Sequence, residues 1–429
     1  MVTHYDFTVA TPLRIDSEQR FACAQCGRCC HRFHVVVSEA EVAHYRTRNV
    51  AAWFRDTDGA EGDGGDPFEP FAGQAGLHRI RQRADGACGF LSADNRCRIH
   101  EEIGAAKKPL TCRVFPYAFH AAADSVVVTA SFGCPTIVAN QGQPIATGAS
   151  LIAIESLRKE WFAGRSPSSA PLQLVTGRTL TTRSGRVVRE GLLAMLKGDG
   201  ADIRDNIRRI ASTIDDLTRS RVVALSDADF AEYVSLTVPH AVATSGAPAN
   251  QPSLPRHSAP AKAGVIARLL QYGFLFTVTA VRAELEAPGQ SRWGLRLRRL
   301  QLLAHFHGLA PGRDRVNVSA LKRARLNVND PEVRPIVVNY LRAALETLGA
   351  QGRPIVDELS IAASSLNAAA ALAIMNADAA GQVVDGRIFS GALMEVADVS
   401  HAHNALLGWV MKRFGGGSEA LWFLAEGPR

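Results

Sequence analysis

The residues of this chain best suited to chemistry are four cysteines within the stretch FACAQCGRCC, residues 21–30. Two residues separate Cys23 from Cys26 and Cys26 from Cys29, and Cys30 follows directly. A two-residue spacing lets one tight turn aim two sulfurs at a single metal ion, and thiolates are soft ligands that suit zinc or iron–sulfur clusters. The spacing therefore predicts a metal-binding knuckle.

The remaining cysteines lie further along the first third of the chain, in segments that constrain the backbone. Turn residues at 93–95 predict a hairpin that brings Cys88 and Cys97 together. Prolines flank Cys112, and a β-branched strand ends just before Cys134. We expect every cysteine to be a metal ligand: Cys23, Cys26, Cys29, Cys30, Cys88, Cys97, Cys112 and Cys134. Eight thiols suit two four-ligand sites, but one occupied site with spare or redox-active thiols fits the spacing equally well.

Neighbouring residues add alternatives to this ligand set. Because adjacent side chains tend to diverge, we expect Cys29 and Cys30 to serve two different metals, or to be a ligand and its neighbour. A histidine in a loop can replace a thiol, and three are close enough in sequence to do so: His31, His34 and His100. Lys108 and Arg113 could balance the negative charge of a thiolate-rich site.

A disulfide framework is the main alternative to metal binding, because the number of cysteines is even. Residues 1–16 show neither the basic region nor the apolar region of a secretory signal. We therefore expect a cytoplasmic protein, and thiols stay reduced in the cytoplasm. Metal ligation is the favoured interpretation.

Hydrophobic periodicity predicts a second, helical part of the chain. Two stretches after Thr181 place apolar residues on one face of a helix: Val188, Leu192, Leu193 and Leu196, then Ile203, Ile207, Ile210 and Ile214. Ser38 and Glu41 form a capping box that predicts a helix to about Arg55. The glycine-rich stretch 56–70 lacks the lysine and spacing of a phosphate loop, which favours a solvated insertion.

The predicted fold class is α+β, with a small irregular cysteine-rich metal-binding domain followed by a mostly α-helical region. The expected divisions are a cysteine-cluster domain at 1–140, a helical region at 141–241, a Pro-, Ala- and Ser-rich linker or long loop at 242–262, and a helical domain at 263–429. Helices are expected within 263–309, from about 330 to 349, and within 403–417, where glycines end the last one.

Composition sets the broad class of protein. With 47% hydrophobic and 21% charged residues over 429 positions, the chain is typical of a globular protein. The apolar stretch 269–281 is too short to span a bilayer, so we expect no membrane insertion. A net charge of +7 permits an acidic partner. Nucleic acid is not indicated, because arginines at 292–299 among leucines are typical of the rim of a buried helix.

Five linked motifs carry a family resemblance. Phe21-x-Cys23-x2-Cys26-Gly27-x-Cys29-Cys30 is followed by Gly86-x-Cys88-x-Phe90-Leu91, by Cys97-x-Ile99-His100, by Lys108-Pro109-x2-Cys112-Arg113-x-Phe115-Pro116, and by Cys134-Pro135. In order and content they resemble the YkgJ-type cysteine-cluster family, the CxxCxxCC zinc- or iron-chelating domain, over residues 20–140. Lys108 and Thr136 depart from the arginine and glycine common in that family.

The resemblance implies a bound iron–sulfur cluster, with [4Fe-4S] favoured, or zinc. The leading hypothesis is a cytoplasmic metal-binding protein whose helical part binds a protein partner or substrate. Some relatives resemble flagellin lysine N-methylases, which implies methyl transfer from S-adenosylmethionine to a protein lysine. However, no strand-GxGxxG-helix unit is found for that donor, and Phe33 stands where a radical S-adenosylmethionine motif needs a third thiol. A non-catalytic interaction protein with structural zinc is the third hypothesis.

Overall fold

The structure is a computed structural model. It describes residues 11–54, 65–71, 73–122, 124–163, 170–198, 202–243, 327–402 and 418–426. Three predictions fall outside these ranges: the helical stretch at 263–309 with its arginines, the helix at 403–417, and all of the linker after Ala243. The domain divisions therefore stay predictions.

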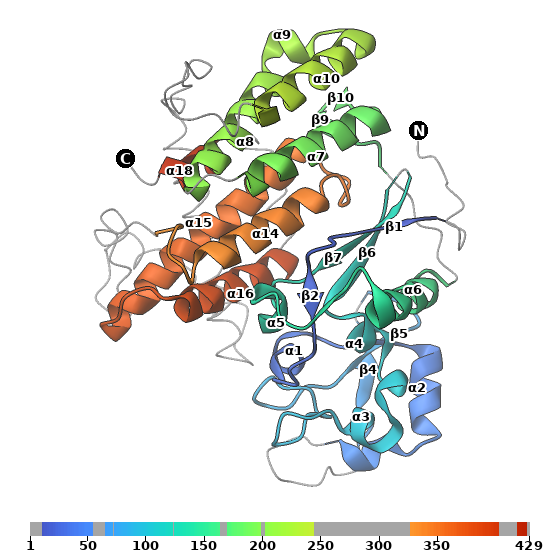
Figure 1. The fold of residues 1–429 in the computed structure, drawn as a ribbon. Helices are drawn as coiled ribbons and strands as arrows, with labels where there is room; N and C mark the ends of the chain where they lie inside the picture. Colours follow the sequence, from blue (N-terminus) through green and yellow to red (C-terminus); the bar gives the residue numbers. More distant parts are fainter. Residues whose placement is uncertain are drawn as a thin grey trace.

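The cysteine-bearing part is built from short elements around a small sheet (Figure 1). Its three strands are antiparallel and run in the order β3–β5–β4: Val36–Ser38, Leu77–Ile80 and Phe68–Pro70. Short helices surround the sheet: α1 at Arg28–Arg32, α2 at Glu39–Arg46, η1 at Val50–Trp53, α3 at Arg98–Ile103, η2 at Ala105–Lys107 and α4 at Leu110–Val114. A separate apolar core that includes Tyr45, Phe54 and Phe90 holds this part together.

Helix α2 and the glycine-rich stretch 56–70 agree with the sequence predictions only in part. The capping box of α2 is confirmed, because Glu41 N–H donates to the Ser38 hydroxyl and the Glu41 carboxylate accepts from Ser38. The helix nevertheless ends at Arg46, since Asn49 adopts a left-handed conformation with φ 52° and starts η1. The solvated insertion predicted at 56–70 is wrong at its end, because Phe68 is buried in β4.

A second sheet lies between the cysteine-bearing part and the helices. Strand β1 (Leu13–Ile15) runs parallel to β7 (Val126–Ala130), and β7 pairs with β6 (Tyr117–Ala121) in an antiparallel hairpin. Helix α6 (Gly148–Phe162) packs on this sheet, with Ile154 in the shared core. Three smaller elements complete the junction: β2 (Arg20–Phe21), β8 (Gln143–Pro144) and α5 (Pro135–Val138).

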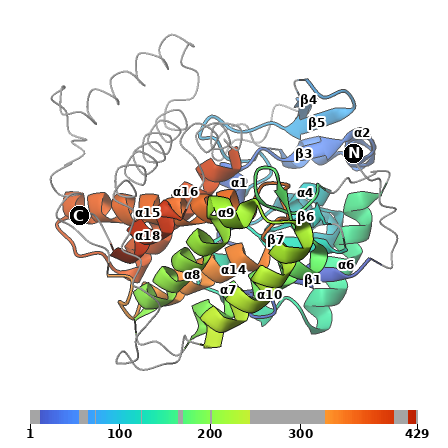
Figure 2. The ribbon, with the colours of Figure 1, turned by 90° about the horizontal axis from the view of Figure 1, so that it is seen from above.

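The remaining described elements are almost all helical, which confirms the predicted α+β class. A short hairpin of β9 (Gln173–Val175) and β10 (Arg178–Thr179) leads into them. The helices are α7 at Thr182–Lys197, α8 at Ile203–Thr218, α9 at Ser220–Val223, α10 at Asp227–Ala243, α14 at Arg334–Glu346, α15 at Ile355–Ala380, α16 at Gly386–Ala402 and α18 at Glu419–Glu426. Seen from above, α15 and α16 run side by side (Figure 2).

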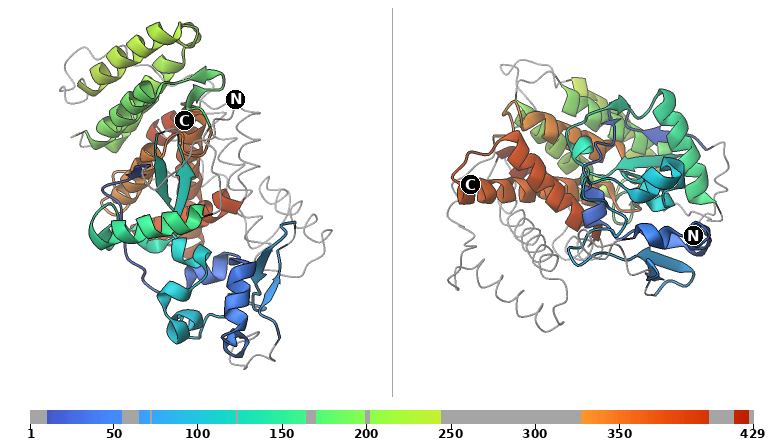
Figure 3. Two further views of the ribbon diagram at one scale, coloured as in Figure 1. Left: turned by 90° about the vertical axis from the view of Figure 1, so that its right-hand side faces the viewer. Right: turned by 90° about the horizontal axis from the view of Figure 1, so that it is seen from below.

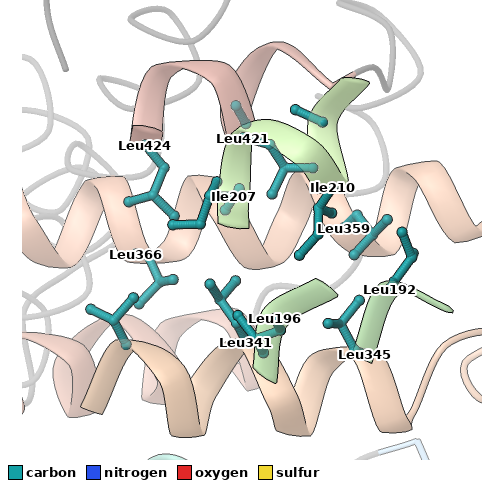
Figure 4. Close-up of a cluster of buried hydrophobic side chains, with 14 of the residues drawn as sticks. Leu192, Leu196, Ile207, Ile210, Leu341, Leu345, Leu359, Leu366, Leu421 and Leu424 are labelled. Atoms are coloured by element: carbon teal, nitrogen blue, oxygen red, sulfur yellow. The ribbon is translucent and has the colours of Figure 1, made fainter. Parts of the chain in front are cut away.

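The periodic leucines and isoleucines form the core of this helical part, as predicted. Leu192 and Leu196 of α7 meet Ile207 and Ile210 of α8, together with leucines of α14, α15 and α18 (Figure 4).

Helix α15 packs against α14, α16 and α18. Its stretch Ile355–Ala377 is the one described segment long and apolar enough to cross a membrane, and 72% of its apolar window is buried in the protein, as in a core helix.

Candidate metal centre

The cysteine-rich stretch begins with an exposed loop and ends in a short helix. Cys23 and Cys26 are exposed, and Gly27 opens α1 with a left-handed φ of 70°. A Cβ atom on Gly27 would lie 2.7 Å from Oδ1 of Asn95, so only glycine lets the loop rest against the turn between Cys88 and Cys97. The stretch is thereby held against the second cysteine motif.

Cys29 and Cys30 occupy consecutive positions in α1. Their sulfurs lie 4.0 Å apart, within hydrogen-bonding range. The two side chains thus do not diverge in this helix. That Cys29 and Cys30 serve two different metals, or are a ligand and its neighbour, stays a prediction.

Four cysteines from four separate segments pack around one apolar core. Cys88 is buried, and the other three pack against the same cluster of buried side chains; we call this set the inner thiols: Cys30, Cys88, Cys97 and Cys112. The Cys88 N–H donates to the carbonyl of Cys30 at 2.8 Å, which joins the first two motifs directly. The predicted turn at 93–95 is confirmed, because an antiparallel β-bridge pairs Leu91 with Cys97 on its two sides.

The segment that carries Cys112 is anchored from several sides. The Thr111 hydroxyl donates to the carbonyl of Val36 at 2.8 Å, and the N–H of Leu110 donates to the Glu41 carboxylate at 2.7 Å. The buried Tyr45 hydroxyl donates to the carbonyl of Lys107 at 2.8 Å. These bonds tie α4 to β3 and α2 and so hold Cys112 beside the core.

The environment pushes the thiols of Cys30, Cys88 and Cys112 towards their neutral form. Burial raises the pKa of Cys88 to about 12, against a partly compensating hydrogen bond from the backbone of Phe90. Burial and then the neighbouring Cys88 raise the pKa of Cys112 well above its usual value. The pKa of Cys30 is raised because its proton is held in the hydrogen bond to Cys29, and burial adds to this. A bound cation would reverse these shifts, because a coordinating thiol is deprotonated outright.

Cys29 differs from these thiols. The hydrogen bond donated by Cys30 is the main cause that lowers its pKa to about 6, with help from Lys108 and against the effect of burial. A thiolate is the form that acts as a nucleophile and as a metal ligand. Cys29 is thus poised to bind a metal or to react at neutral pH.

Of the two cations proposed to balance the thiols, the structure places one beside them. Burial lowers the pKa of Lys108, but Cys112, Cys97, Cys30 and Cys29 outweigh that effect and raise it. Arg113 instead forms a two-pronged ion pair with Glu160 on α6 and donates to the carbonyl of Lys108. Its role is therefore corrected: Arg113 anchors the segment, and Lys108 alone of the pair faces the sulfurs.

The other four cysteines form a second, looser set, which we call the outer thiols: Cys23, Cys26, Cys29 and Cys134. Cys134 is buried at the junction with the helices, and burial raises its pKa. The Thr136 hydroxyl lies 3.2 Å from its sulfur and partly offsets this rise. Cys26 is close enough to Cys134 to influence its ionisation. The threonine that departs from the family pattern thus supports this thiol.

All eight cysteines are free thiols, so the structure does not support a disulfide framework. The three candidate histidines, His31, His34 and His100, are exposed. Within the described residues no three His, Cys, Asp or Glu side chains stand ready to hold a metal ion. Metal binding would have to draw the sulfurs inward, as happens where binding and folding are coupled. The donor chemistry, with soft sulfurs, an apolar surround and one cation, fits a thiolate-bound metal.

One feature of the site could not be read from the cysteine motifs. Arg28, between Cys26 and Cys29, donates to the carbonyl of Gly133 at 3.1 Å and to Asp398 of α16 at 2.7 Å. Arg32 approaches the same carboxylate at 4.0 Å. Burial raises the pKa of Asp398 to about 6, against the opposing effect of Arg28. No local signal could have revealed a contact across 370 residues of sequence.

Comparison with known proteins supports the assignment of this part. Residues 22–135, which contain all eight cysteines, match the family model CxxCxxCC, described as "Putative zinc- or iron-chelating domain". The resemblance of the cysteine motifs to the CxxCxxCC domain is thereby confirmed. The chain gave no match among curated proteins or among solved structures.

Proposed function

We propose that residues 22–135 hold a thiolate-bound metal centre and that the helical part offers a surface to a protein partner or substrate. One observation carries the proposal: Cys30, Cys88, Cys97 and Cys112 come from four segments and pack against one apolar core. Four cysteine ligands are what both a structural zinc site and an iron–sulfur cluster require. Lys108 beside these sulfurs supplies compensating positive charge.

An iron–sulfur cluster, with [4Fe-4S] favoured, and zinc are the two candidates for the inner thiols. The inner thiols are distant from one another in sequence, so their spacing matches neither the ligand pairs of structural zinc sites nor the closely spaced cysteines of common cluster motifs. When bound, a cluster would supply electron transfer and zinc would supply a structural link. In either case Cys30, Cys88, Cys97 and Cys112 would hold the group, and Tyr45 and Phe90 would shield it from water.

The outer thiols support a second, adjoining centre. Cys23 and Cys26 have the spacing of a knuckle, and their exposed loop leaves room for them to move towards Cys134. Cys29 has the lowered pKa that favours a ligand thiolate. The 4.0 Å between Cys29 and Cys30 would place the two centres side by side.

The proposals about location and partner rest on the sequence. A reduced thiol cluster suits the cytoplasm, where disulfides are rare. A net charge of +7 suits an acidic protein partner or substrate. Transfer of a methyl group to a protein lysine stays a prediction from the resemblance alone.

The experiment is anaerobic purification of the full chain, followed by iron, sulfide and zinc quantitation on one sample. Cys88→Ser combined with Cys112→Ser removes half of the inner thiols, and Glu102→Ala changes an exposed residue of α3 as a control. The proposal expects metal in the unaltered chain and in the control, and a lower metal content in the double variant, which keeps only the outer centre intact. Equal metal content in the double variant would refute the assignment.

A further inference from the structure

The helix that carries Cys29 and Cys30 is tied to the far end of the chain by charge. None of the residues of helix α1 is fully buried, and Cys30 is the α1 residue that packs against the apolar core of the cysteine-bearing part. Its arginines instead face α16: Arg28 forms an ion pair with Asp398 at 2.7 Å, and Arg32 lies 4.0 Å from the same oxygen. Figure 2 shows α1 beside the end of α16.

The same carboxylate also lies against the segment that carries Cys134. Arg28 donates to the carbonyl of Gly133 at 3.1 Å. A Cβ atom on Gly133 would lie 2.5 Å from Oδ1 of Asp398, so glycine is what lets the carboxylate approach this closely. The ion pair therefore touches both outer-thiol segments, the one with Cys26 and Cys29 and the one with Cys134.

The surroundings of Asp398 make this contact energetically important. The side chains of Arg28 and Asp398 are 22% and 14% exposed, so water screens the pair little. The second oxygen, Oδ1, is buried and has no hydrogen-bond partner among the described residues. Removal of one partner from a pair of this kind is costly, because it leaves the other charge poorly solvated.

The segment after Cys134 is held by the helical part as well. Asn339 of α14 donates to the carbonyls of Ile137 and Val138 at 2.8 and 3.3 Å, which fixes the end of α5. Cys134 itself belongs to the large core of the helical part. The outer thiols thus span a junction, with one ligand in the helical body and the others on α1 and the loop before it.

We infer that Asp398 is a positioning residue that couples the metal centre to helix α16. This inference rests on the proposed function. By orienting Arg28, Asp398 sets the distance between the α1 thiols and Cys134, and the carbonyl of Gly133 completes the link. Coupling between two sites is reciprocal, so a metal that gathers the outer thiols must also stabilise the packing of α16.

The first test measures metal affinity in the full chain. Anaerobic titration with Co²⁺ follows the thiolate-to-metal absorption, and Asp398→Asn is compared with the unaltered chain. Loss of a group that orients ligands typically costs about 10–100-fold in metal affinity, and that weakening is expected here. Asp227→Asn serves as the control, because it removes the carboxylate facing another buried arginine, Arg178, within the helical part. The control should bind Co²⁺ as the unaltered chain does.

The second test asks whether the coupling is reciprocal. Hydrogen exchange of α16 is measured with and without Co²⁺. Metal should slow exchange in α16 of the unaltered chain and of Asp227→Asn, and should slow it much less in Asp398→Asn. A merely local structural role for Asp398 would change exchange equally with and without metal.

The possible outcomes distinguish failure of the coupling from failure of the proposed metal centre. If the unaltered chain shows no thiolate absorption with Co²⁺, the proposed metal centre fails and the coupling fails with it. If the unaltered chain binds Co²⁺ and Asp398→Asn matches it in affinity and in α16 exchange, only the coupling is refuted. A circular dichroism spectrum matched to the unaltered chain shows that each variant is folded.

Discussion

The sulfurs of Cys29 and Cys30 lie 4.0 Å apart on consecutive residues of α1, and a hydrogen bond joins them. The bond lowers the pKa of one thiol and raises that of the other, so a single proton is held between them. The pair therefore offers one thiolate and one thiol at neutral pH. It also marks the place where the inner and outer thiols meet.

Alkylation of Cys29 should report its lowered pKa. Because the thiolate is the nucleophile, the rate in metal-free protein should rise with pH and reach half its maximum at about pH 6. Cys30→Ala removes the hydrogen-bond donor and should move this midpoint towards the usual range for a thiol. Timed reaction with iodoacetamide and peptide mapping gives the midpoint. An unshifted midpoint in Cys30→Ala would contradict the assigned cause.

In the metal-free protein, a cysteine-to-serine substitution should lower the free energy of unfolding more at a buried position than at an exposed one. Cys88→Ser buries a hydroxyl in an apolar core and should lower the free energy of unfolding by about 1–3 kcal/mol. Cys23→Ser lies at an exposed position and should change it by less than about 0.5 kcal/mol. Urea denaturation with a chelator present measures both. Equal costs would show that Cys88 does not belong to the core.

Gly27 should be irreplaceable for two separable reasons. Its φ of 70° is strained for any residue with a Cβ, which costs about 1–2 kcal/mol in Gly27→Ala. The new methyl would also meet Asn95. Adding Asn95→Gly to Gly27→Ala removes the whole Asn95 side chain and suits the left-handed φ of 61° at that position, so it should relieve the contact and leave the backbone strain at residue 27, and urea denaturation should show partial recovery. Full recovery, or none, would contradict this division.

A buried arginine joins the N-terminal segment to the helical part. Arg342 of α14 pairs with Asp16 at 2.9 Å and with Glu18 at 3.0 Å, and it donates to Asn339. Arg342→Ala would leave Asp16 buried without its partner, and it should lower the free energy of unfolding by about 3–5 kcal/mol. Arg208→Ala breaks an exposed pair with Asp205 on α8 and should cost less than about 1 kcal/mol. Similar costs in denaturant would argue against a buried network.

Local sequence patterns predicted the parts of this fold that local physics determines. The capping box at Ser38 and the amphipathic helices α7 and α8 were predictable because hydrogen bonding and periodicity mark them. Helix α15 lies within the region 263–429 predicted to be helical, but its bounds were not predicted, since it is rich in alanine and buried on several sides and so shows little amphipathic pattern. Its burial comes from packing against α16, α18 and α14.

The candidate site, like the fold, was predictable from the sequence only in part. The eight ligand candidates were predictable from spacing, but their grouping was not, because it depends on which segments share an apolar core. Lys108 and Arg113 look alike in sequence, and only the position of Glu160 on α6 separates their roles. In Figure 3 the cysteine-bearing part and the α9–α10 end of the helical part lie at opposite ends of the molecule. Asp398 pairs with Arg28 from 370 residues further along the chain, a separation that no sequence motif spans.

The most direct test of the central claim is metal and sulfide quantitation, with a visible spectrum, on anaerobically purified protein with and without the inner thiols. The account predicts stoichiometric metal in the unaltered chain, with iron, sulfide and absorption at roughly 400 nm if a cluster is bound. It predicts loss of that metal when Cys30, Cys88, Cys97 and Cys112 are all replaced by serine. Undiminished metal in the fourfold variant, or none in the unaltered chain, would contradict it.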